Sequence, residues 1–482
     1  MRNIGNTTIA GTTAPDLEIP FGSCLIEENP DPCMIVIVGA SGDLTARKII
    51  PALFNLYLNN GLSDPFLVVG CARTKLSDQE FRDKMKDALL SANIHNNSKW
   101  QGFSQSLYYQ AIDYEELSSF KALAGSLAGS LRKLDIEHGM KGNRVFYLAI
   151  PPSLYKSTAQ MLGNAGLSTE DENKNGWVRI VVEKPFGRDL DTAIDLDRSL
   201  HEHFGEHQIF RIDHYLAKET VQNILMFRFA NAIFEPIWNS QNHMMQLLAL
   251  TAMDPPSLFE ADRVRDEKVK VYRTIRPFPT ADLQDYLVLG QYAAGTIDGK
   301  KVPAYRDEAD INPESLTPTF AMMKIFLDNW RWQGVPFYLT SGKRLAKKRT
   351  EIVIQFKEVP HSMFRKTLGE HITANRLILG IYPDEKISLT FQTKNPGAKV
   401  CLRSVTMDFN YNQNYIGPVL DAYEKVLLDV MLGDHMLFWR QDGVELCWAF
   451  LTPILEGCET CDDRSKLLLP YESGSWGPEA IK

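Results

Sequence analysis

The sequence lacks the long apolar runs that membrane proteins and secreted precursors need. No stretch approaches the roughly 20 apolar residues of a membrane-spanning helix, and residues 1–20 contain no apolar core for a signal peptide. The chain also lacks a basic excess, because its formal net charge is −8, which disfavours nucleic-acid and membrane-surface binding. We therefore expect a cytoplasmic protein that binds neither nucleic acid nor membrane.

Cysteine is scarce as well. The seven cysteines are scattered and odd in number, which fits free thiols in a reducing compartment better than a disulfide framework. The close pair Cys458 and Cys461 lacks the second pair that a structural zinc site would need. Hydrophobic residues make up 44% of the chain and charged residues 23%, the balance of an ordinary globular protein. A chain of 482 residues with this composition predicts two or three packed domains.

Short apolar runs alternate with amphipathic segments from Met34 onward. Runs such as MIVIVG and FLVVGCA are typical of parallel strands that are buried on both faces. This alternation predicts a Rossmann-type, doubly wound parallel sheet in an α/β domain at 34–212, preceded by a tail at 1–33. We predict strands at 34–39, 66–72, 144–150, 179–185 and 208–213, and helices at 43–59, 79–92, after 152, and at 189–204.

The pattern changes from about Asp213. A long helix is expected first, followed by longer alternating runs such as EIVIQF at 351–356 and KISLTFQT at 386–393. Alternation of this kind is typical of an antiparallel sheet that is covered on one face. We therefore predict a second, larger α+β domain at 213–482 with a mainly antiparallel sheet.

A glycine turn, GASGDL at 39–44, joins the first predicted strand to the helix that follows it. Gly39 would permit the sharp turn, Gly42 would let the backbone approach a pyrophosphate, and the helix N-terminus offers free amides and a positive dipole end. The spacing GxxG departs from the usual GxGxxG, so the turn is informative through its place in a βα run. It predicts dinucleotide contacts at Gly39, Ser41, Gly42, Asp43 and Leu44.

The end of the second predicted strand indicates which dinucleotide binds. An NAD enzyme places an acid there for the ribose 2′-hydroxyl, whereas this chain has Arg73, Thr74 and Lys75. A guanidinium suits a 2′-phosphate by charge and by its two-pronged geometry. The sequence therefore favours NADP over NAD, although a solvated loop of ordinary charges would give the same residues.

Asp213 and His214 follow the strand predicted at 208–213, at the sheet edge where open α/β folds bind their ligands. Histidine is suited to accept a hydroxyl proton near neutral pH when a carboxylate fixes its tautomer. His214 and His243 are both candidates for such a base. The residues alone do not separate the two.

Three segments carry a close resemblance to a known family: GASGDL at 39–44, EKPFGRD at 183–189 and RIDHYLAKE at 211–219. Together they resemble the glucose-6-phosphate dehydrogenases, and the likeness continues to about Pro453. The resemblance implies NADP-dependent oxidation of glucose 6-phosphate to 6-phosphogluconolactone, the first step of the oxidative pentose phosphate pathway. It also implies a homodimer or homotetramer in which 34–212 binds NADP and 213–482 binds substrate and dimerises.

The resemblance further implies roles for individual residues. His243 would be the base, Asp213 its carboxylate partner, and Lys184 would lie between cofactor and sugar. The basic run GKRLAKKR at 342–349 and a lysine one helical turn after His214 supply cations for a phosphate dianion. The resemblance implies that the sugar phosphate is bound by His214, Tyr215, Lys218, Lys343 and Lys348.

The stretch HEHFGEH at 201–207 could suggest a metal site, because its imidazoles recur at short spacing. It lies at the polar end of a predicted helix, and hydride transfer in the family needs no metal. We interpret His201, His203 and His207 as a solvated helix end and expect no metal.

One departure from the family pattern concerns the segment before His243. After FEPIWN at 234–239 the chain passes through Ser240 directly into QNH at 241–243, where family members have a strand and two turns. Trp238 stands five residues before His243, where the family has an acid, so two sugar-binding carboxylates lack a counterpart. This apparent deletion leaves a second hypothesis, a cofactor-binding but catalytically impaired relative, and a third, a sugar oxidoreductase with another substrate.

Overall fold

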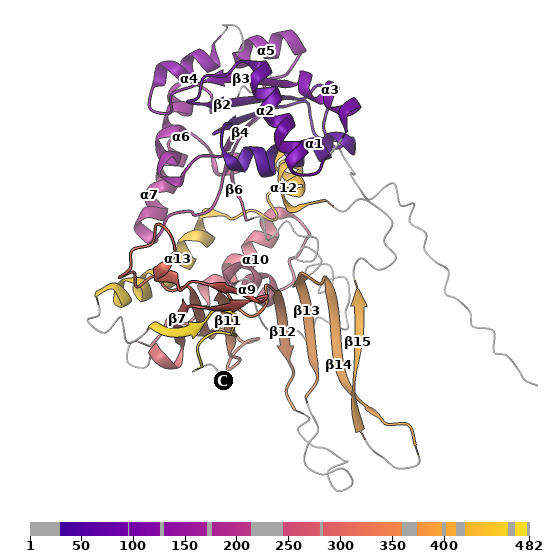
Figure 1. Cartoon of the computed structure of the whole chain (residues 1–482), viewed down its shortest axis with the longest axis vertical. Helices are drawn as coiled ribbons and strands as arrows, with labels where there is room; N and C mark the ends of the chain where they lie inside the picture. The colour runs from indigo at the N-terminus through magenta and orange to yellow at the C-terminus, as the bar shows by residue number, and fades with distance from the viewer. Residues whose placement is uncertain are drawn as a thin grey trace, which may run out of the picture.

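The computed structural model describes most of the chain (Figure 1). His214, Tyr215, Lys218 and His243 lie outside the described residues, as do the expected long helix after Asp213 and the apparent deletion at 239–243. No helix within the described ranges is long and apolar enough to cross a membrane. Those ranges are 29–94, 96–125, 130–170, 176–213, 244–279, 283–358, 374–397, 402–410, 420–460 (backbone only from 457) and 468–479.

The N-terminal part of the chain is built on a six-stranded parallel sheet in the order β3-β2-β1-β4-β5-β6. Every residue of the inner strands β1 and β2 is buried, because helices cover both faces of the sheet. This confirms the doubly wound Rossmann-type fold. The strands are β1 (Met34–Val38), β2 (Leu67–Ala72), β3 (Leu107–Ala111), β4 (Arg144–Leu148), β5 (Val178–Val182) and β6 (Ile209–Arg211).

Alternate residues of each strand face opposite cores. Met34, Val36 and Val38 of β1 belong to one apolar cluster, whereas Ile35 and Ile37 belong to the other. Helices α4, α5, α6 and α7 supply residues to the first cluster, and α1, α2 and α3 supply the second. These helices are α1 (Ile50–Leu58), α2 (Asp78–Ser91), α3 (Asn97–Gln105), α4 (Leu117–Ala124), α5 (Leu131–His138), α6 (Tyr155–Asn164) and α7 (Leu190–His201).

The second part of the chain contains two four-stranded sheets, ordered β11-β10-β7-β16 and β12-β13-β14-β15. All their pairings are antiparallel except that of β16 with β7, which confirms a mainly antiparallel second domain. The strands are β7 (Leu287–Ala293), β10 (Phe320–Ile325), β11 (Phe337–Gly342), β12 (Thr350–Gln355), β13 (Arg376–Tyr382), β14 (Lys386–Lys394), β15 (Leu402–Asn410) and β16 (Leu468–Glu472), with a hairpin of β8 (Gly295–Ile297) and β9 (Lys300–Val302).

Four described helices connect this domain to the first. One of them, α12, returns to the Rossmann domain and packs beside α1, where Asn55 donates a 2.8 Å hydrogen bond to Glu424 (Figure 1). Another, α13, packs against α7 and α10. The helices are α9 (Met244–Ala252), α10 (Ala261–Arg273), α12 (Ala422–Leu432) and α13 (Gln441–Thr460).

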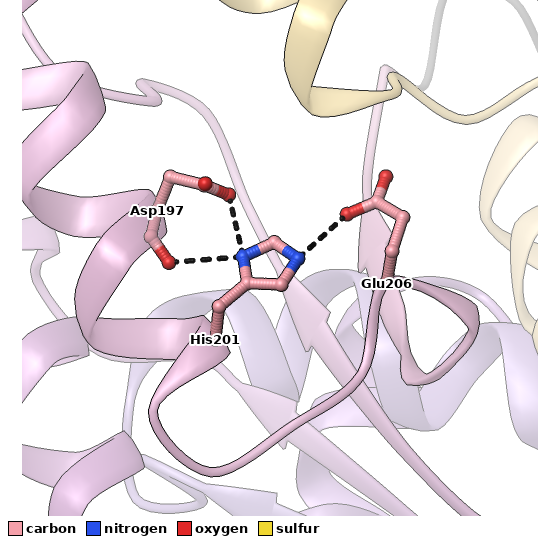
Figure 2. A group of neighbouring side chains, drawn as sticks. All are labelled: Asp197, His201 and Glu206. Carbon is pink, nitrogen blue, oxygen red and sulfur yellow. Dashed lines mark hydrogen bonds and ion pairs between the residues drawn. The ribbon is translucent and has the colours of Figure 1, made fainter.

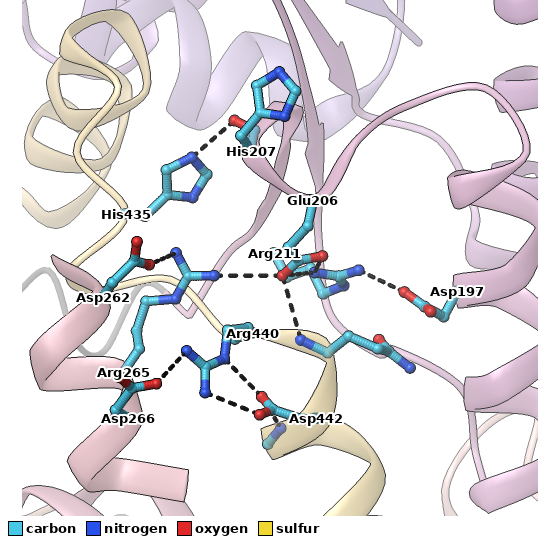
Figure 3. Close-up of polar contacts among 12 residues, drawn as sticks. Asp197, Glu206, His207, Arg211, Asp262, Arg265, Asp266, His435, Arg440 and Asp442 are labelled. Carbon is cyan, nitrogen blue, oxygen red and sulfur yellow. Dashed lines mark hydrogen bonds and ion pairs between the residues drawn. The ribbon is translucent and has the colours of Figure 1, made fainter.

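A charged network lies where the two domains meet (Figure 3). At its centre the Glu206 carboxylate accepts hydrogen bonds from Arg211 at 2.9 and 3.0 Å and from Arg265 of α10 at 3.4 Å. The backbone amide of Gln441, the first residue of α13, also donates to Glu206 at 3.4 Å. Glu206 therefore connects α10 and the start of α13 to Arg211 of the edge strand β6. Arg211 lies two residues before Asp213.

Candidate active site

The glycine turn after β1 is shaped by close approach of the backbone. Gly39 has a φ of +101°, and a Cβ at this position would lie 2.1 Å from the Ala149 carbonyl oxygen after β4. Only glycine fits here, at the point where the strand order reverses between β1 and β4. The amides of Gly39 and Ala40 donate to the Cys71 carbonyl, and the Gly42 amide donates to the Gly39 carbonyl at 2.9 Å, which fixes the shape of the turn. The turn therefore fits a dinucleotide pyrophosphate.

Arg73 lies at the end of β2, on the same edge of the sheet, and is exposed. Its guanidinium stands 5.6 Å from the centre of the Tyr114 ring, an arrangement that orients the cation. Lys84 of α2 also reaches this edge, because its Nζ donates a 2.8 Å hydrogen bond to the Ser41 carbonyl. The sequence did not identify Lys84, which is separated from Ser41 by 43 residues. Two cations therefore flank the turn.

Lys184 and Asp213 are brought together from the ends of neighbouring strands. Lys184 follows β5, Asp213 follows β6, and the lysine Nζ lies 2.5 Å from the carboxylate Oδ2. The Lys184 side chain is 42% exposed and that of Asp213 only 4%. The pair thus presents an accessible ammonium and a buried carboxylate at the ligand-binding edge of the sheet.

Two contacts that the sequence did not reveal fix the loop on which Lys184 stands. Glu183 accepts a 2.6 Å hydrogen bond from the Tyr147 hydroxyl of β4, and the Trp448 indole of α13 donates a 2.9 Å bond to the Phe186 carbonyl. Burial raises the pKa of Tyr147 well above its ordinary value, and the neighbouring Glu183 carboxylate adds to the rise. Tyr147 therefore stays protonated and acts as a donor. The loop is held from both domains.

The pair lines one of two cavities that share a residue. A mostly apolar cavity of about 340 Å³ is bounded by Lys184, Asp213 and residues of α9 and α13. A larger cavity of about 850 Å³ is bounded by the basic run at 342–349 and by Trp476. Met244, the first residue of α9, lines both cavities. The Lys184–Asp213 pair is thus connected to a strongly basic wall.

The basic wall contains both lysines assigned to phosphate binding. Lys343 and Lys348 line the 850 Å³ cavity, and the Lys348 ammonium lies 5.3 Å from the centre of the Tyr382 ring. Neighbouring Arg344 and Arg349 form ion pairs with Glu308 at 2.7 Å and Glu351 at 3.1 Å. Those acids neutralise the arginines, whereas within the described residues neither lysine forms a salt bridge. Lys343 and Lys348, with Lys347 of the same cavity, are therefore cations available to a dianion.

Asp197, His201 and Glu206 form a group with the spacing of metal ligands (Figure 2). The His201 ring nitrogens lie 3.0 Å from Asp197 and 3.4 Å from Glu206, so His201 is more restrained than the solvated helix end that we expected. Arg211 contacts the same two acids at 2.6 and 2.9 Å. A guanidinium already supplies the positive charge, and we assign no metal to this group.

Comparison with known proteins gives consistent results along the whole chain. Residues 36–223 match the family described as glucose-6-phosphate dehydrogenase, NAD binding domain, and residues 240–482 match the C-terminal domain of the same family. The chain is 43% identical to the glucose-6-phosphate 1-dehydrogenase of Aggregatibacter actinomycetemcomitans, over 93% of this chain and 94% of the relative. For the enzyme of Bacillus subtilis the identity is 38%, over 92% and 95%.

A solved structure, glucose-6-phosphate dehydrogenase in complex with its substrate glucose-6-phosphate, superimposes with a TM-score of 0.83 at 33% identity. It covers 94% of this chain and 97% of the solved chain. A second structure, the enzyme from Mycobacterium avium, has a TM-score of 0.77 at 26% identity. The likeness therefore includes both domains.

Proposed function

Because the chain belongs to the glucose-6-phosphate dehydrogenase family, we propose that it oxidises glucose 6-phosphate to 6-phosphogluconolactone with NADP as cofactor, in the oxidative pentose phosphate pathway. The observation that carries this proposal is the Lys184–Asp213 pair, which follows strands of the sheet that bears the glycine turn and lines a cavity that shares Met244 with the basic cavity. In this arrangement 34–212 binds NADP, and 213–482 binds the substrate and dimerises.

The reaction needs a base for the proton of the anomeric hydroxyl. We assign this role to His243. The next residue in the chain, Met244, lines both cavities. Asp213 holds the histidine tautomer and stabilises the imidazolium that forms, as a buried carboxylate can do without being protonated. Lys184 neutralises Asp213 and faces the open side of the cavity. The glycine turn would hold NADP, which would supply the hydride acceptor.

Substrate recognition requires donors that converge on a phosphate dianion. Lys343 and Lys348 supply two of them from the basic wall, because an ammonium forms a charge-assisted hydrogen bond with phosphate. By the resemblance of RIDHYLAKE to the family motif, His214, Tyr215 and Lys218 supply the others.

The proposal is tested by following NADPH formation with glucose 6-phosphate, alongside glucose and other sugar phosphates. We expect turnover that depends on both NADP and the phosphate group. Oxidation of a different sugar only would favour the related oxidoreductase, and cofactor binding without turnover would favour the impaired relative. The likeness to a relative named glucose-6-phosphate 1-dehydrogenase, over 94% of that relative, supports the working dehydrogenase.

Arg73 carries the first prediction. If its guanidinium contacts the 2′-phosphate, Arg73→Ala should weaken NADP binding by about tenfold to a hundredfold and leave NAD binding nearly unchanged, because a charge-assisted hydrogen bond is lost. Fluorescence titration of both cofactors measures this. Arg132→Ala, which removes an exposed arginine from α5, is the matched control. Equal affinities of the unmodified protein for NAD and NADP would contradict the assignment.

The outer sheet of the second domain supports assembly of the chain with its own copies. Among the described strands β15 pairs with β14 alone, so it is the edge strand of this sheet (Figure 1). Met407 and Phe409 lie on one face of β15, and each is 59% exposed. Large apolar side chains at a sheet edge are typical of an interface. We expect light scattering to give the mass of two or four 54.6 kDa chains; a single-chain mass at micromolar concentration would contradict this.

A further inference from the structure

A group of buried polar side chains lies behind the Lys184–Asp213 pair and has no part in the mechanism above. Lys268 of α10 is 3% exposed, and Tyr272, one helical turn later, is 4% exposed. Gln246 of α9 is also buried. Within the described chain, both side-chain polar atoms of Gln246, the Tyr272 hydroxyl and the Trp439 indole nitrogen have no hydrogen-bond partner. So many buried polar atoms without partners indicate a bound polar group.

These side chains line part of a small cavity of about 10 Å³, which Arg265 and Arg440 also border. This volume is at the lower end of what one water molecule needs, and the residues with unpartnered polar atoms, Gln246, Tyr272 and Trp439, offer the polar partners that a bound water requires. Gln246 and Trp439 also line the 340 Å³ cavity that contains Asp213. The small cavity and the active-site cavity therefore share a polar wall.

Lys268 interacts electrostatically with groups from several elements. Arg265 on the same helix and Arg440 before α13 repel its ammonium, whereas Asp213 after β6 and Cys447 of α13 favour it. Burial is the largest influence, and with Arg265 it lowers the pKa of Lys268 to about 7. The same cluster holds the pKa of Tyr272 well above its ordinary value, chiefly by burial, so the hydroxyl remains a donor.

We propose that Lys268 is a positioning residue for the dehydrogenase reaction, which holds the orientation and charge of Asp213 across this cavity through a water bound by Gln246, Tyr272 and Trp439. The inference rests on the proposed function and adds a residue behind its site. Asp213 then has one cation on each side, Lys184 facing solvent and Lys268 in the interior. A carboxylate held from both sides stays ionised and keeps a fixed direction toward the base.

The burial of Lys268 supports a role in function rather than in stability. Removing an ammonium from water costs free energy that an apolar side chain of the same length would not incur. Groups that lower stability and have strongly shifted pKa values are concentrated at functional sites. Lys270, two residues later, shows the usual environment of a helix lysine. Its side chain is 65% exposed and pairs with Glu267 at 2.5 Å.

The test compares Lys268→Met with the matched control Lys270→Met on the same helix. Lys268→Met should lower kcat/KM for glucose 6-phosphate by up to about a hundredfold, the cost of a loosely held catalytic group. It should also move the acid limb of the pH profile to higher pH, because loss of a nearby cation favours protonation of Asp213 and its partner base. Lys270→Met should change neither, and NADP affinity should be unchanged in both.

Lys268→Arg, which keeps the cation, should return the pH profile toward that of the unmodified protein, as a purely packing role would not. Lys268→Gln serves if the methionine variant fails to fold. An unshifted pH profile in the neutral variants, with the unmodified protein active, would overturn the inference and leave the proposed function intact. Absence of glucose 6-phosphate oxidation in the unmodified protein would instead overturn the proposed function.

A melting experiment tests the burial independently of activity. The folded pKa of Lys268 is about 7 and the ordinary value 10.5, so the folded state disfavours the ammonium. The cost is absent above the ordinary pKa, grows as the pH falls from 10.5 toward 7, and is complete below 7. Lys268→Met should therefore melt higher than the unmodified protein at pH 7, and the difference should shrink toward pH 10. A constant difference would contradict a buried lysine.

Discussion

Replacing Asp213 with asparagine is expected to lower kcat for glucose 6-phosphate oxidation by roughly 10²- to 10⁴-fold, with little change in KM for either substrate. The Asp213 carboxylate is buried and lies 2.5 Å from the Lys184 ammonium. An amide there cannot stabilise an imidazolium, and its NH₂ group can orient the base in the wrong tautomer. Because these effects arise in the transition state, they reduce turnover rather than binding.

Steady-state kinetics of Asp213→Asn, with NADP affinity measured separately, checks this prediction. Asp195→Asn is the matched control, because Asp195 also pairs with a lysine, Lys156 at 2.9 Å, but its side chain is 61% exposed and lies outside both cavities. A kcat for Asp213→Asn within a few-fold of the unmodified value would show that Asp213 has only a structural role.

The parts of the fold that the sequence predicted are those with strong local patterns. β1 is a continuous buried run of five apolar residues followed by a glycine with φ of +101°, and either feature can be inferred from neighbours in the chain. β3 was not predicted. As an edge strand of the sheet it alternates buried and partly buried residues, so it lacks the continuous apolar run of the central strands.

The sequence predicted the residues of the candidate site better than the contacts that hold those residues in place. Lys184 and Asp213 each follow a strand, and parallel neighbours bring their carboxyl ends to one edge. By contrast, the bond from Trp448 to Phe186 joins residues 262 positions apart, and no local pattern indicates it. Lys268 lies in ADRVRDEKVKVYR, a helix rich in both charges, where spacing alone does not distinguish a buried lysine from a solvated one.

Replacing Arg211 with methionine is expected to lower the free energy of unfolding by about 3–5 kcal/mol, the usual cost of removing one partner of a buried ion pair. Arg211 is 2% exposed and contacts both Asp197 and Glu206 (Figure 3). Burial raises the pKa of Asp197, and Arg211 is the main influence that opposes the rise. Without it, Asp197 and Glu206 lose their nearest counter-charge, and among the described residues only the longer contacts with His201 and Arg265 remain. Denaturant titration followed by fluorescence measures the change.

An exposed arginine separates burial from ion pairing as the cause. Arg276 binds Asp328 through two nitrogens, at 3.0 and 2.5 Å, but both side chains are about half exposed. Arg276→Met should leave the unfolding midpoint almost unchanged, because exposed pairs are screened by water. A further variant combines Glu206→Gln with Arg211→Met. It should recover part of the lost free energy of unfolding, because it removes the charge of one of the two acids that Arg211 contacts and the two sites are coupled. If Arg211→Met lowered the free energy of unfolding no more than Arg276→Met, the ion pairs of Arg211 with Asp197 and Glu206 would not stabilise the domain junction.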